Sequence, residues 1–587
     1  MTRPGSDETG PVNGGDAIAD VLARQGAWFL FTLCGGHISP ILVGAKRRGI
    51  RVVDVRHEAT AVFAADAVAR LTGTPGVAAV TAGPGATNAV TATKNAWLAQ
   101  SPVVLIGGAA ATLLKGRGAL QDIDQLALFR PHVKWAASVK SLREIAPKME
   151  RAFRVARSGV PGPVFVEFPV DLLYDERTVR DWYAGAAGSG GPGFRARARR
   201  WYVERHVNRL FAGGGREPTR APAAVETPEP SPRTIARAAE VVARAQRPLL
   251  LLGSQCLTDP SSAGSLATAV ERLGAPAYLS GMARGLLGVT HPLLFRHRRR
   301  EALREADLVI LAGTPLDFRL DYGRHLGRST TLIAANRSKK ELKKNRRPTI
   351  GSVADAARFV ERLAAVSTAP GGWDAWIEEL RVREREREED MAELAREKTQ
   401  YINPLSLCYK IDRALADDSV LVMDGGDFVA TAAYVIRPRG PVSFLDPGVF
   451  GTLGVGAGFA LGAKLCRPEA QVWILYGDGS AAYSLAEIDT FARHGIGVVA
   501  VIGNDGAWTQ IQRGQQEMLE DDVATVLRRS DYESVAEGYG GRGFRVENLE
   551  NVEAILAEAK ETAREGSPAL VNALIGTTDF RSGSISI

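Results

Sequence analysis

Short apolar runs, each bounded by Gly, Pro or Asp, recur along the chain and alternate with longer stretches of helical period. Such runs predict buried parallel strands, and the stretches between them predict the crossover helices. The pattern therefore predicts an α/β protein built from Rossmann-like, doubly wound parallel sheets. The expected strands lie at residues 28–33, 51–55, 77–81, 103–108 and 164–169, then at 248–253, 308–313 and 331–336, and finally at 420–426, 472–479, 497–505 and 569–576.

These strands fall into three blocks separated by two segments of different composition. One segment, near 186–232, is rich in Gly, Arg and Pro, and the other follows Pro370 and reads as a helix laced with charges, most simply a solvated face. A chain of 587 residues also exceeds what one hydrophobic core usually supports. We expect domains at 1–186, 233–370 and 371–587, with a basic insertion at 187–232.

The basic insertion contains a stretch dense in arginine, residues 194–220, in which Val203, Val207, Leu210 and Phe211 recur at helical spacing. An amphipathic helix docked in a linker is the favoured interpretation, and a helix on a membrane surface is the alternative. The chain carries 73 basic and 66 acidic residues, a formal net charge of +7. No nucleic-acid-binding motif accompanies this charge, so nucleic acid is not an expected partner.

The cysteines and the first residues of the chain indicate in which cellular compartment the protein is expected. The four cysteines lie far apart without a CxxC pair, which predicts neither a disulfide framework nor a zinc site. The first fifteen residues lack the apolar core of a signal peptide, and no run of about twenty apolar residues occurs. We expect a cytoplasmic protein without an integral membrane segment.

The third block carries the strongest chemical signal. Gly477, Asp478 and Gly479 follow one expected strand, and Asn504 and Asp505 end the next. Because ligands gather at the carboxyl ends of parallel strands, these oxygen-bearing side chains are expected at one site. Hard oxygen ligands suit Mg²⁺, and the glycines let backbone N–H groups approach a diphosphate.

Two motifs of the first block are weaker when taken separately. Arg56-His57-Glu58 follows one expected strand, and the carboxylate could simply cap the next helix. Residues 83–88, GPGATN, follow the next strand and could be an ordinary Gly/Pro turn.

Taken together, these motifs are similar to those of the thiamine-diphosphate-dependent enzymes of the acetolactate synthase and 2-hydroxyacyl-CoA lyase group. The matching pieces span nearly the whole chain in the family's order. They are RHEATA at 56–61, GPGATN at 83–88, GALQDIDQ at 118–125, PGPVFVEFPVD at 161–171, GTLGVGAGFALGAKL at 451–465, and the Gly-Asp-Gly and Asn-Asp pair.

The resemblance implies a pyrimidine-binding domain, a central Rossmann-like domain and a diphosphate-binding domain. It also implies a homodimer at least, with a tetramer expected, because family active sites form between the pyrimidine domain of one subunit and the diphosphate domain of another. Glu58 resembles the carboxylate that hydrogen-bonds N1′ of the aminopyrimidine and so prepares the cofactor to lose its C2 proton. The implied cofactor contacts are Gly36, Glu58, Pro84, Asn88, Gly426, Leu453, Gly477, Gly479 and Ser480.

The resemblance also assigns the metal ligands and the residues near the reacting carbon. Asp478, Asp505 and the backbone carbonyl of Ala507 match the ligands of Mg²⁺, although many relatives have Asn where Asp505 stands. Gln121 and His37 match positions facing the thiazolium, and His37 could instead be a structural histidine.

Glu487 lies nine positions after Asp478, on an expected helix where a charged residue is usually solvated. Relatives that cleave 2-hydroxyacyl-CoA place a glutamate there, so a catalytic role is expected. The favoured reaction is cleavage of 2-hydroxyacyl-CoA to formyl-CoA and an aldehyde or ketone, reversible as a condensation. Acetolactate synthase, oxalyl-CoA decarboxylase and a degenerate regulatory subunit are the alternatives.

Ligands of the central domain are less clearly indicated. The segment after residues 248–253 could form a phosphate-binding turn for a nucleotide such as ADP, but Asn336 stands where a ribose-binding acid would be expected, so a purely structural domain is favoured. No decisive FAD signature is present, and FAD is not expected. Arg284 and Arg581 are the expected contacts to CoA phosphates, because guanidinium groups pair well with phosphate oxygens.

Overall fold

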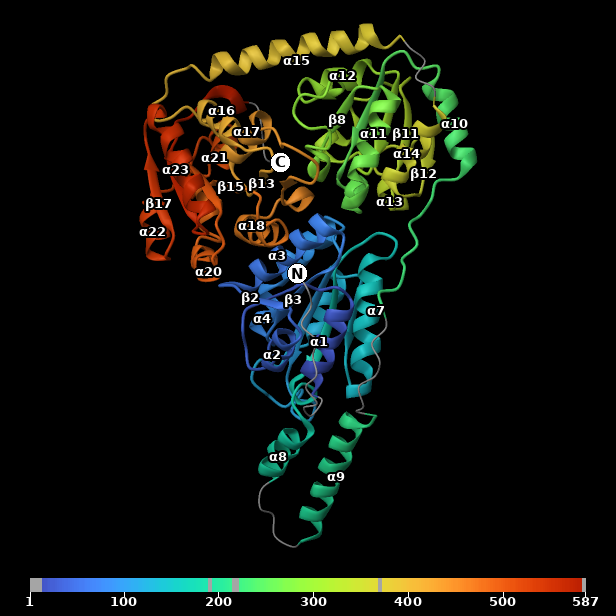
Figure 1. The fold of residues 1–587 in the computed structure, drawn as a ribbon, viewed down its shortest axis with the longest axis vertical. Helices are drawn as coiled ribbons and strands as arrows, with labels where there is room; N and C mark the ends of the chain where they lie inside the picture. The colour runs from blue at the N-terminus through green and yellow to red at the C-terminus, as the bar shows by residue number, and fades with distance from the viewer. Residues whose placement is uncertain (1–12, 188–192, 214–220, 368–371, 583–587) are drawn as a thin grey trace. The chain divides into compact units, whose positions relative to one another are not determined.

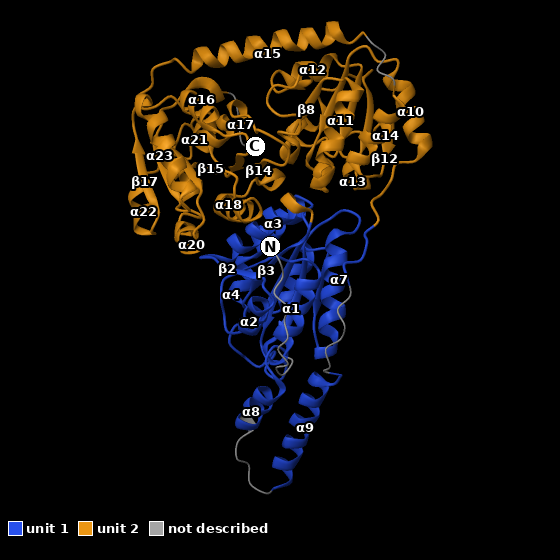
Figure 2. Cartoon of the chain, viewed as in Figure 1, with its two compact units in different colours: residues 1–69, 74–225 blue, residues 70–73, 226–587 orange. Residues whose placement is uncertain are grey.

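The computed structural model describes residues 13–187, 193–213, 221–367 and 372–582. They form two compact units, one of residues 1–69 and 74–225 and one of residues 70–73 and 226–587 (Figure 2). Residues 1–12 and the expected boundary at residue 370 lie outside the described part of the chain. Within the described part of the chain, no helix combines the length and the apolar character needed to cross a membrane.

Unit 1 is built on a parallel sheet of strand order β2-β1-β3-β4-β6-β5 (Figure 1). Its central strand β4 is buried along its full length, as its apolar sequence VVLIGGA predicts. The strands are β1 Phe29–Thr32, β2 Arg51–Asp54, β3 Gly76–Val80, β4 Val103–Ala109, β5 Trp135–Ser138 and β6 Val164–Pro169. The helices are α1 Gly14–Arg24, α2 Ser39–Arg47, α3 Glu58–Thr72, α4 Pro84–Asn88, α5 Val90–Leu98, α6 Gln125–Phe129, α7 Ile145–Arg157, α8 Glu176–Ala187 and α9 Phe194–Phe211.

The core of unit 1 lies between its sheet and the helices α1, α2 and α7. Helix α1 begins after Asn13, whose side chain accepts the Asp16 N–H, and it buries Ile18, Val21 and Leu22 in this core. The end of the basic helix α9 joins the same core through its apolar positions. The expected docking of this helix through Val207, Leu210 and Phe211 is therefore observed, with Val203 partly buried beside them.

Unit 2 contains two further parallel sheets. The first has the order β12-β11-β10-β7-β8-β9. Its strands are β7 Pro248–Leu252, β8 Ala277–Leu279, β9 Leu294–Phe295, β10 Leu308–Ala312, β11 Thr331–Ala335 and β12 Ile350–Ser352. Its helices are α10 Pro232–Val242, α11 Ala263–Leu273, α12 Arg299–Glu305, α13 Lys339–Leu342 and α14 Ala356–Val366.

The second sheet of unit 2 has the order β14-β13-β15-β16-β18-β17. Its strands are β13 Val420–Met423, β14 Phe444–Leu445, β15 Val472–Gly477, β16 Val499–Asn504, β17 Arg542–Val546 and β18 Ala569–Leu574. Its helices are α16 Pro404–Ala414, α17 Asp427–Val435, α18 Val455–Cys466, α19 Asp478–Ala481, α20 Glu487–His494, α21 Thr509–Leu519, α22 Tyr532–Gly538 and α23 Val552–Arg564. Three parallel sheets with crossover helices confirm the predicted α/β class.

Helix α15, Asp374–Leu394, connects the two sheets of unit 2. Its charged sequence predicts a solvated face, yet Trp376, Ile377, Leu380 and Met391 are buried. The Trp376 indole N–H donates to the Pro248 carbonyl at the start of β7, 3.1 Å away. Many of the charges therefore lie on the outer side of a helix whose apolar and aromatic residues contact the sheet.

Candidate functional site

Two carboxylates lie at the carboxyl ends of the neighbouring strands β15 and β16. Gly477 pairs with Gly503 in the strand register, so Asp478 and Asp505 leave the same edge of the sheet. The Asp478 carboxylate accepts the N–H of Gly479 and of Gly506, each at 2.8 Å. Asp505 accepts the Thr509 hydroxyl at 2.6 Å. Asn504 instead donates its amide to Asn572 and Ser530, so the acid and not the amide of the Asn-Asp pair reaches this edge.

The electrostatics of this carboxylate pair suit a divalent cation. Burial, and then the neighbouring charge of Asp505, raise the pKa of Asp478 to about 7. Burial also raises the pKa of Asp505. A cation between the two carboxylates would offset both the lost hydration and the mutual repulsion. The residues therefore fit a Mg²⁺ ion, with the Ala507 carbonyl following two positions after Asp505.

A glycine cradle, formed by Gly425, Gly426, Gly477 and Gly479, lies beside these carboxylates. The Gly477 N–H donates to the Gly425 carbonyl at 2.9 Å, and Gly426 has a φ of 114° that favours glycine. A β-carbon on Gly426 would lie 3.1 Å from the Gly477 Cα. The Ser480 hydroxyl donates to the carbonyls of Gly425 and Gly477, so it braces the cradle from behind. Such close, side-chain-free backbone fits a diphosphate.

Leu453 lies on a loop that Asp424 holds in place. The two carboxylate oxygens of Asp424 accept the N–H of Gly454 at 2.9 Å and of Gly456 at 2.6 Å. Burial raises the pKa of Asp424 to about 7, while these backbone donors act against that rise. The sequence motifs did not single out Asp424, although its position directly after β13 is the same strand-end signal that reveals Asp478.

Glu487 is the first residue of α20 and is buried, contrary to the usual solvation of a charged helical position. Its carboxylate accepts the Thr490 hydroxyl at 2.6 Å. Its backbone N–H donates to the carbonyl of Ser484, whose hydroxyl lies 3.1 Å from that of Tyr476. A buried carboxylate in the unit that carries Asp478 and Asp505 is suited to proton transfer.

Unit 1 places its own carboxylate at the carboxyl end of its sheet. Glu58 begins α3, is buried, and accepts the Asn88 side-chain amide at 3.0 Å. Gly85 lies close to Thr81, since a β-carbon there would come within 2.8 Å of the Thr81 Cγ2. Pro84 opens α4 after Gly83, which has a φ of 62°. The structure thus brings Glu58 and Asn88 together, with Pro84 at the start of the helix that ends at Asn88.

His37 and Gln121 lie near each other at the same end of this sheet. Burial lowers the pKa of His37, and a hydrogen bond with the Gln121 side chain opposes that change. The His37 Nδ1 lies 3.4 Å from the Thr81 hydroxyl. Gln121 has a φ of 63°, a conformation that costs energy for a residue other than glycine and is typical of functional sites. Gly36, next to His37, is exposed and has open space around its Cα.

A buried hydrogen-bond network supports the loop at Gly83, and none of its side chains was predicted as a site residue. The Gln125 side chain accepts the Gly83 N–H at 3.3 Å and donates to Glu167 at 3.0 Å. Lys115 forms an ion pair with the other oxygen of Glu167 at 2.6 Å. Gln125 and Glu167 belong to the motifs at 118–125 and 161–171, so these motifs have a structural role in positioning the site.

An arginine-lined cavity of about 540 Å³ lies in unit 2. Arg284 lines it, donates to the Ala433 carbonyl at 3.0 Å and covers the Phe444 ring, and burial lowers the pKa of this guanidinium. Asp321 is the one carboxylate among the described lining residues. The lining arginines are Arg284, Arg296, Arg298, Arg299, Arg300, Arg319, Arg387 and Arg437.

Arg581 lies beside the cavity without lining it. Its guanidinium stacks over the Tyr434 ring, 5.5 Å from the ring centre, and Tyr434 lines the cavity. It also faces Asp427 at 3.9 Å, at the start of α17. The structure therefore brings the two predicted arginines to one region.

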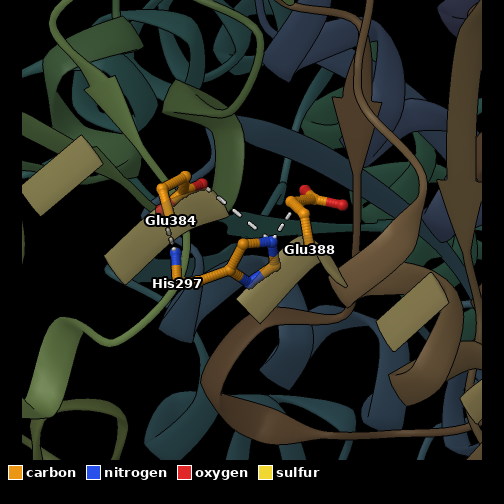
Figure 3. Close-up of side chains that lie close together, drawn as sticks. All are labelled: His297, Glu384 and Glu388. Atoms are coloured by element: carbon orange, nitrogen blue, oxygen red, sulfur yellow. Dashed lines mark hydrogen bonds and ion pairs between the residues drawn. The ribbon is translucent and has the colours of Figure 1, made fainter. Parts of the chain in front are cut away.

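Another cluster of possible metal ligands lies where α15 meets the first sheet of unit 2. His297 Nε2 lies 3.0 Å from Glu388 and 3.9 Å from Glu384 (Figure 3). The Glu384 carboxylate accepts the backbone N–H groups of Arg296 and His297. The Arg296 guanidinium stands 3.8 Å from Glu388, so Glu388 already has a cationic neighbour, while backbone N–H groups satisfy Glu384. The cluster is an ion-pair and hydrogen-bond contact that fastens α15 to the sheet.

The chain has three parallel α/β sheets. One of them carries a carboxylate pair and a glycine cradle at the carboxyl ends of its strands, and another carries a buried glutamate there. This arrangement defines a class of enzyme that holds a phosphorylated cofactor at strand ends. The chain belongs to the thiamine pyrophosphate enzyme family. The family's N-terminal TPP-binding domain matches residues 12–128, its central domain residues 235–363 and its C-terminal TPP-binding domain residues 424–573.

Curated relatives resemble the chain over nearly its full length. The chain is 51% identical to 2-hydroxyacyl-CoA lyase 2 of Danio rerio over 589 residues, covering 99% of this chain and 94% of the relative. It is 50% identical to 2-hydroxyacyl-CoA lyase 2 of Homo sapiens, covering 99% and 93%. Identity to the acetolactate synthase large subunit IlvG of Mycobacterium tuberculosis is 35%, covering 97% of both chains.

Proposed function

We propose that the chain is a thiamine-diphosphate-dependent 2-hydroxyacyl-CoA lyase, which cleaves a 2-hydroxyacyl-CoA to formyl-CoA and an aldehyde or ketone. The arginine-lined cavity carries this proposal, because it favours a substrate with several phosphates over a small 2-oxo acid. The identity of about half of all positions to relatives named 2-hydroxyacyl-CoA lyase 2 supports the same substrate class.

The cofactor and its cation would be held by groups already described. Asp478, Asp505 and the Ala507 carbonyl would bind Mg²⁺, and the backbone of Gly426, Gly477 and Gly479 would receive the diphosphate. Ser480 would support that backbone, and Leu453 would pack against the middle of the cofactor. When bound, thiamine diphosphate supplies the electron sink that makes cleavage of the bond next to the thioester carbonyl possible.

The residues of unit 1 would manage protons at the cofactor ring. Glu58 would exchange a proton with the aminopyrimidine, and the Asn88 amide at 3.0 Å keeps one of its oxygens oriented. Gln121 and His37 would orient the carbonyl oxygen of the substrate, with Gly36 leaving room for it. A neutral imidazole suits this role, because burial lowers the pKa of His37.

Glu487 would act on the substrate itself. Cleavage turns the 2-hydroxyl group into the carbonyl of the released aldehyde or ketone, so that hydroxyl must lose a proton. Glu487 would accept it and later return it to the carbon that becomes the formyl group. Burial keeps bulk water from competing for this proton, and the Thr490 hydroxyl fixes one carboxylate oxygen.

The charged end of CoA would bind in the arginine-lined cavity. Helix α17 begins directly after Gly426 of the cradle, and its residues Ala433 and Tyr434 line the cavity. A helix of this length spans about 13 Å, a distance that the flexible arm of CoA can cover. Arg284 would contact a phosphate group inside the cavity, and Arg581 would contact one at its margin.

Product analysis tests the proposed reaction. The full chain, loaded with thiamine diphosphate and Mg²⁺, is incubated in parallel with 2-hydroxyacyl-CoA, oxalyl-CoA and pyruvate. Equal amounts of formyl-CoA and aldehyde from the first substrate would support the lyase. Acetolactate from pyruvate, or turnover of oxalyl-CoA alone, would replace it with a synthase or a decarboxylase. Absence of both turnover and cofactor binding would favour a regulatory subunit.

The remaining features of the proposal rest on the family resemblance and on composition. We expect a homodimer at least, assembling into a tetramer, located in the cytoplasm, with domain boundaries near residues 186, 232 and 370. The central domain is expected to be structural, without FAD. The strand β7 leads first into a short 3₁₀ turn, Ser254–Leu257, and the helix α11 begins only at Ala263, so the helix does not start directly at the strand end, where a nucleotide diphosphate is usually received.

A further inference from the structure

Helix α9 concentrates the positive charge of the chain. Between Phe194 and Phe211 it carries six arginines and one glutamate, a formal net charge of +5, while the whole chain has +7. The mechanism proposed above uses none of these residues. A helix that holds most of the net charge but contributes no residue to the proposed reaction calls for a separate explanation.

The C-terminal half of α9 is fixed to unit 1, and this fixes which face points outward. Val207, Leu210 and Phe211 are buried in the core of the unit. His206 contacts the Thr112 hydroxyl at 2.7 Å, and Thr112 donates to the buried carboxylate of Asp171. These contacts lie on one side of the helix, so the opposite side must face away from the sheet.

That opposite side carries aromatic and cationic side chains together. At 100° per residue, Phe194, Trp201 and Arg205 fall within a narrow stripe opposite Val207 and Leu210. Phe194 is 80% exposed, Trp201 59% and the neighbouring Tyr202 54%, which is unusual for such large rings. The Arg205 guanidinium lies over the Trp201 ring, 5.2 Å from its centre. We call this stripe, with Arg195, Arg197 and Arg209 beside it, the basic aromatic face.

We propose that the basic aromatic face binds the surface of an anionic lipid bilayer. Arginines are attracted by anionic headgroups and can extend their heads into that layer, while Trp, Tyr and Phe insert at the boundary between headgroups and acyl chains. Helices α8 and α9 lie side by side and extend beyond the end of the sheet of unit 1 (Figure 1). This lets the face lie flat on a surface.

Two other occupants fit the observations less well. A second copy binding through the same face would bring the arginines of both copies together, and like charges across an interface are costly. A single-stranded nucleic acid is usually held in a groove whose walls stack the bases, whereas this face is one convex helix. A bilayer surface supplies both the negative charge and the apolar boundary that the face requires.

Vesicle flotation with the full chain tests the proposal. We expect binding to vesicles of mixed phosphatidylcholine and phosphatidylglycerol, and none to pure phosphatidylcholine. The triple variant Arg195→Gln, Arg197→Gln, Arg205→Gln should bind at least about tenfold more weakly, because each arginine near an anionic surface changes partitioning about fivefold. Phe194→Ser with Trp201→Ser should keep binding at low salt and lose it at physiological salt, because only the electrostatic attraction remains.

A matched control removes exposed arginines elsewhere. Arg362→Gln with Arg385→Gln and Arg564→Gln takes away three largely exposed cationic side chains, and this variant should bind vesicles like the original chain. Thermal unfolding checks that each variant folds, which is expected since the substituted residues do not belong to the docked side. No binding to anionic vesicles, or equal loss in the control, overturns the proposal. So does a change of oligomeric state or of oligonucleotide binding in the triple variant without any lipid binding.

Discussion

Leu453 lies directly against Gly425: a β-carbon added to Gly425 would come within 2.2 Å of the Leu453 Cδ2. The Gly425 carbonyl also accepts the Gly477 N–H and the Ser480 hydroxyl. The absence of a side chain at one position thus lets the Leu453 loop approach the glycine cradle. Leu453 is expected to pack against the cofactor, and the cradle backbone is expected to hold the diphosphate. Both therefore depend on the contact between Leu453 and Gly425.

Substitution Gly425→Ala tests this dependence. The added methyl group must displace Leu453, and overpacking of this kind costs about 1–3 kcal/mol. We expect thiamine diphosphate to bind about tenfold more weakly, as measured by calorimetry with Mg²⁺ present. Gly264→Ala is the control, because a β-carbon at that exposed helical position meets open space. Equal affinity in both variants would show that the contact does not support the cofactor site.

Asp424 should make stability depend on pH. Its pKa in the folded chain is raised to about 7 by burial, from an ordinary value of 3.8. The folded state therefore binds this proton more tightly than the unfolded state, so the contribution of Asp424 is most favourable at low pH and is lost as pH rises through about 7. Between these two pKa values the free energy of unfolding should fall by up to about 1.4 kcal/mol per pH unit because of this group.

The variant Asp424→Asn isolates that contribution. It cannot titrate, so its free energy of unfolding, measured in urea without cofactor, should lack the extra downward slope between pH 5 and 7, a range that lies between the ordinary and the raised pKa of Asp424. All other groups titrate in both proteins and cancel in the difference. Parallel pH profiles of the two proteins would mean that Asp424 is already ionised throughout this range.

Glu487→Gln should separate chemistry from cofactor binding. The amide keeps the shape and the contact with Thr490 but cannot accept a proton, and loss of a general base typically lowers turnover about a hundredfold or more. Release of formyl-CoA measures turnover, and calorimetry measures the affinity for thiamine diphosphate, which should not change. Glu553→Gln removes an exposed carboxylate of the same unit as the control. Full turnover in the Glu487 variant would exclude it as the base.

Apolar runs revealed most inner strands but few edge strands. The edge strand β2 was predicted, whereas the edge strands β5, β9, β12, β14 and β17 and the three-residue inner strand β8 were not. Edge strands are short or half-solvated and so need few consecutive apolar residues; β17 reads RGFRV, and β14 has two residues. Their positions follow from pairing with an inner strand, which local sequence does not record.

The site was predictable where its residues directly follow strands, and less so elsewhere. Glu58 and Asp478 stand next to strand ends and glycine motifs, so topology alone brings them to an edge. The burial of Glu487 depends on how α20 packs, and a charged position at the start of a helix is usually solvated. The arginine-lined cavity combines α12, α15 and α17 with the loops around Arg284 and Arg319, segments too far apart for a spacing rule.

Arg299 offers a test of the cavity in which stability and substrate binding should move in opposite directions. It lines the cavity, burial lowers its pKa, and its guanidinium donates to the Arg319 carbonyl at 2.7 Å. Among the described residues no carboxylate forms an ion pair with it, so the charge is poorly compensated until a phosphate binds.

Arg299→Met should leave the thermal unfolding temperature of the free protein equal or higher. The KM for 2-hydroxyacyl-CoA should rise about tenfold or more with kcat little changed, since a hydrogen bond to a charged group contributes about 1.5–3 kcal/mol. Arg324→Met, at a neighbouring exposed position, should alter neither quantity. An unchanged KM for the Arg299 variant would place CoA outside this cavity.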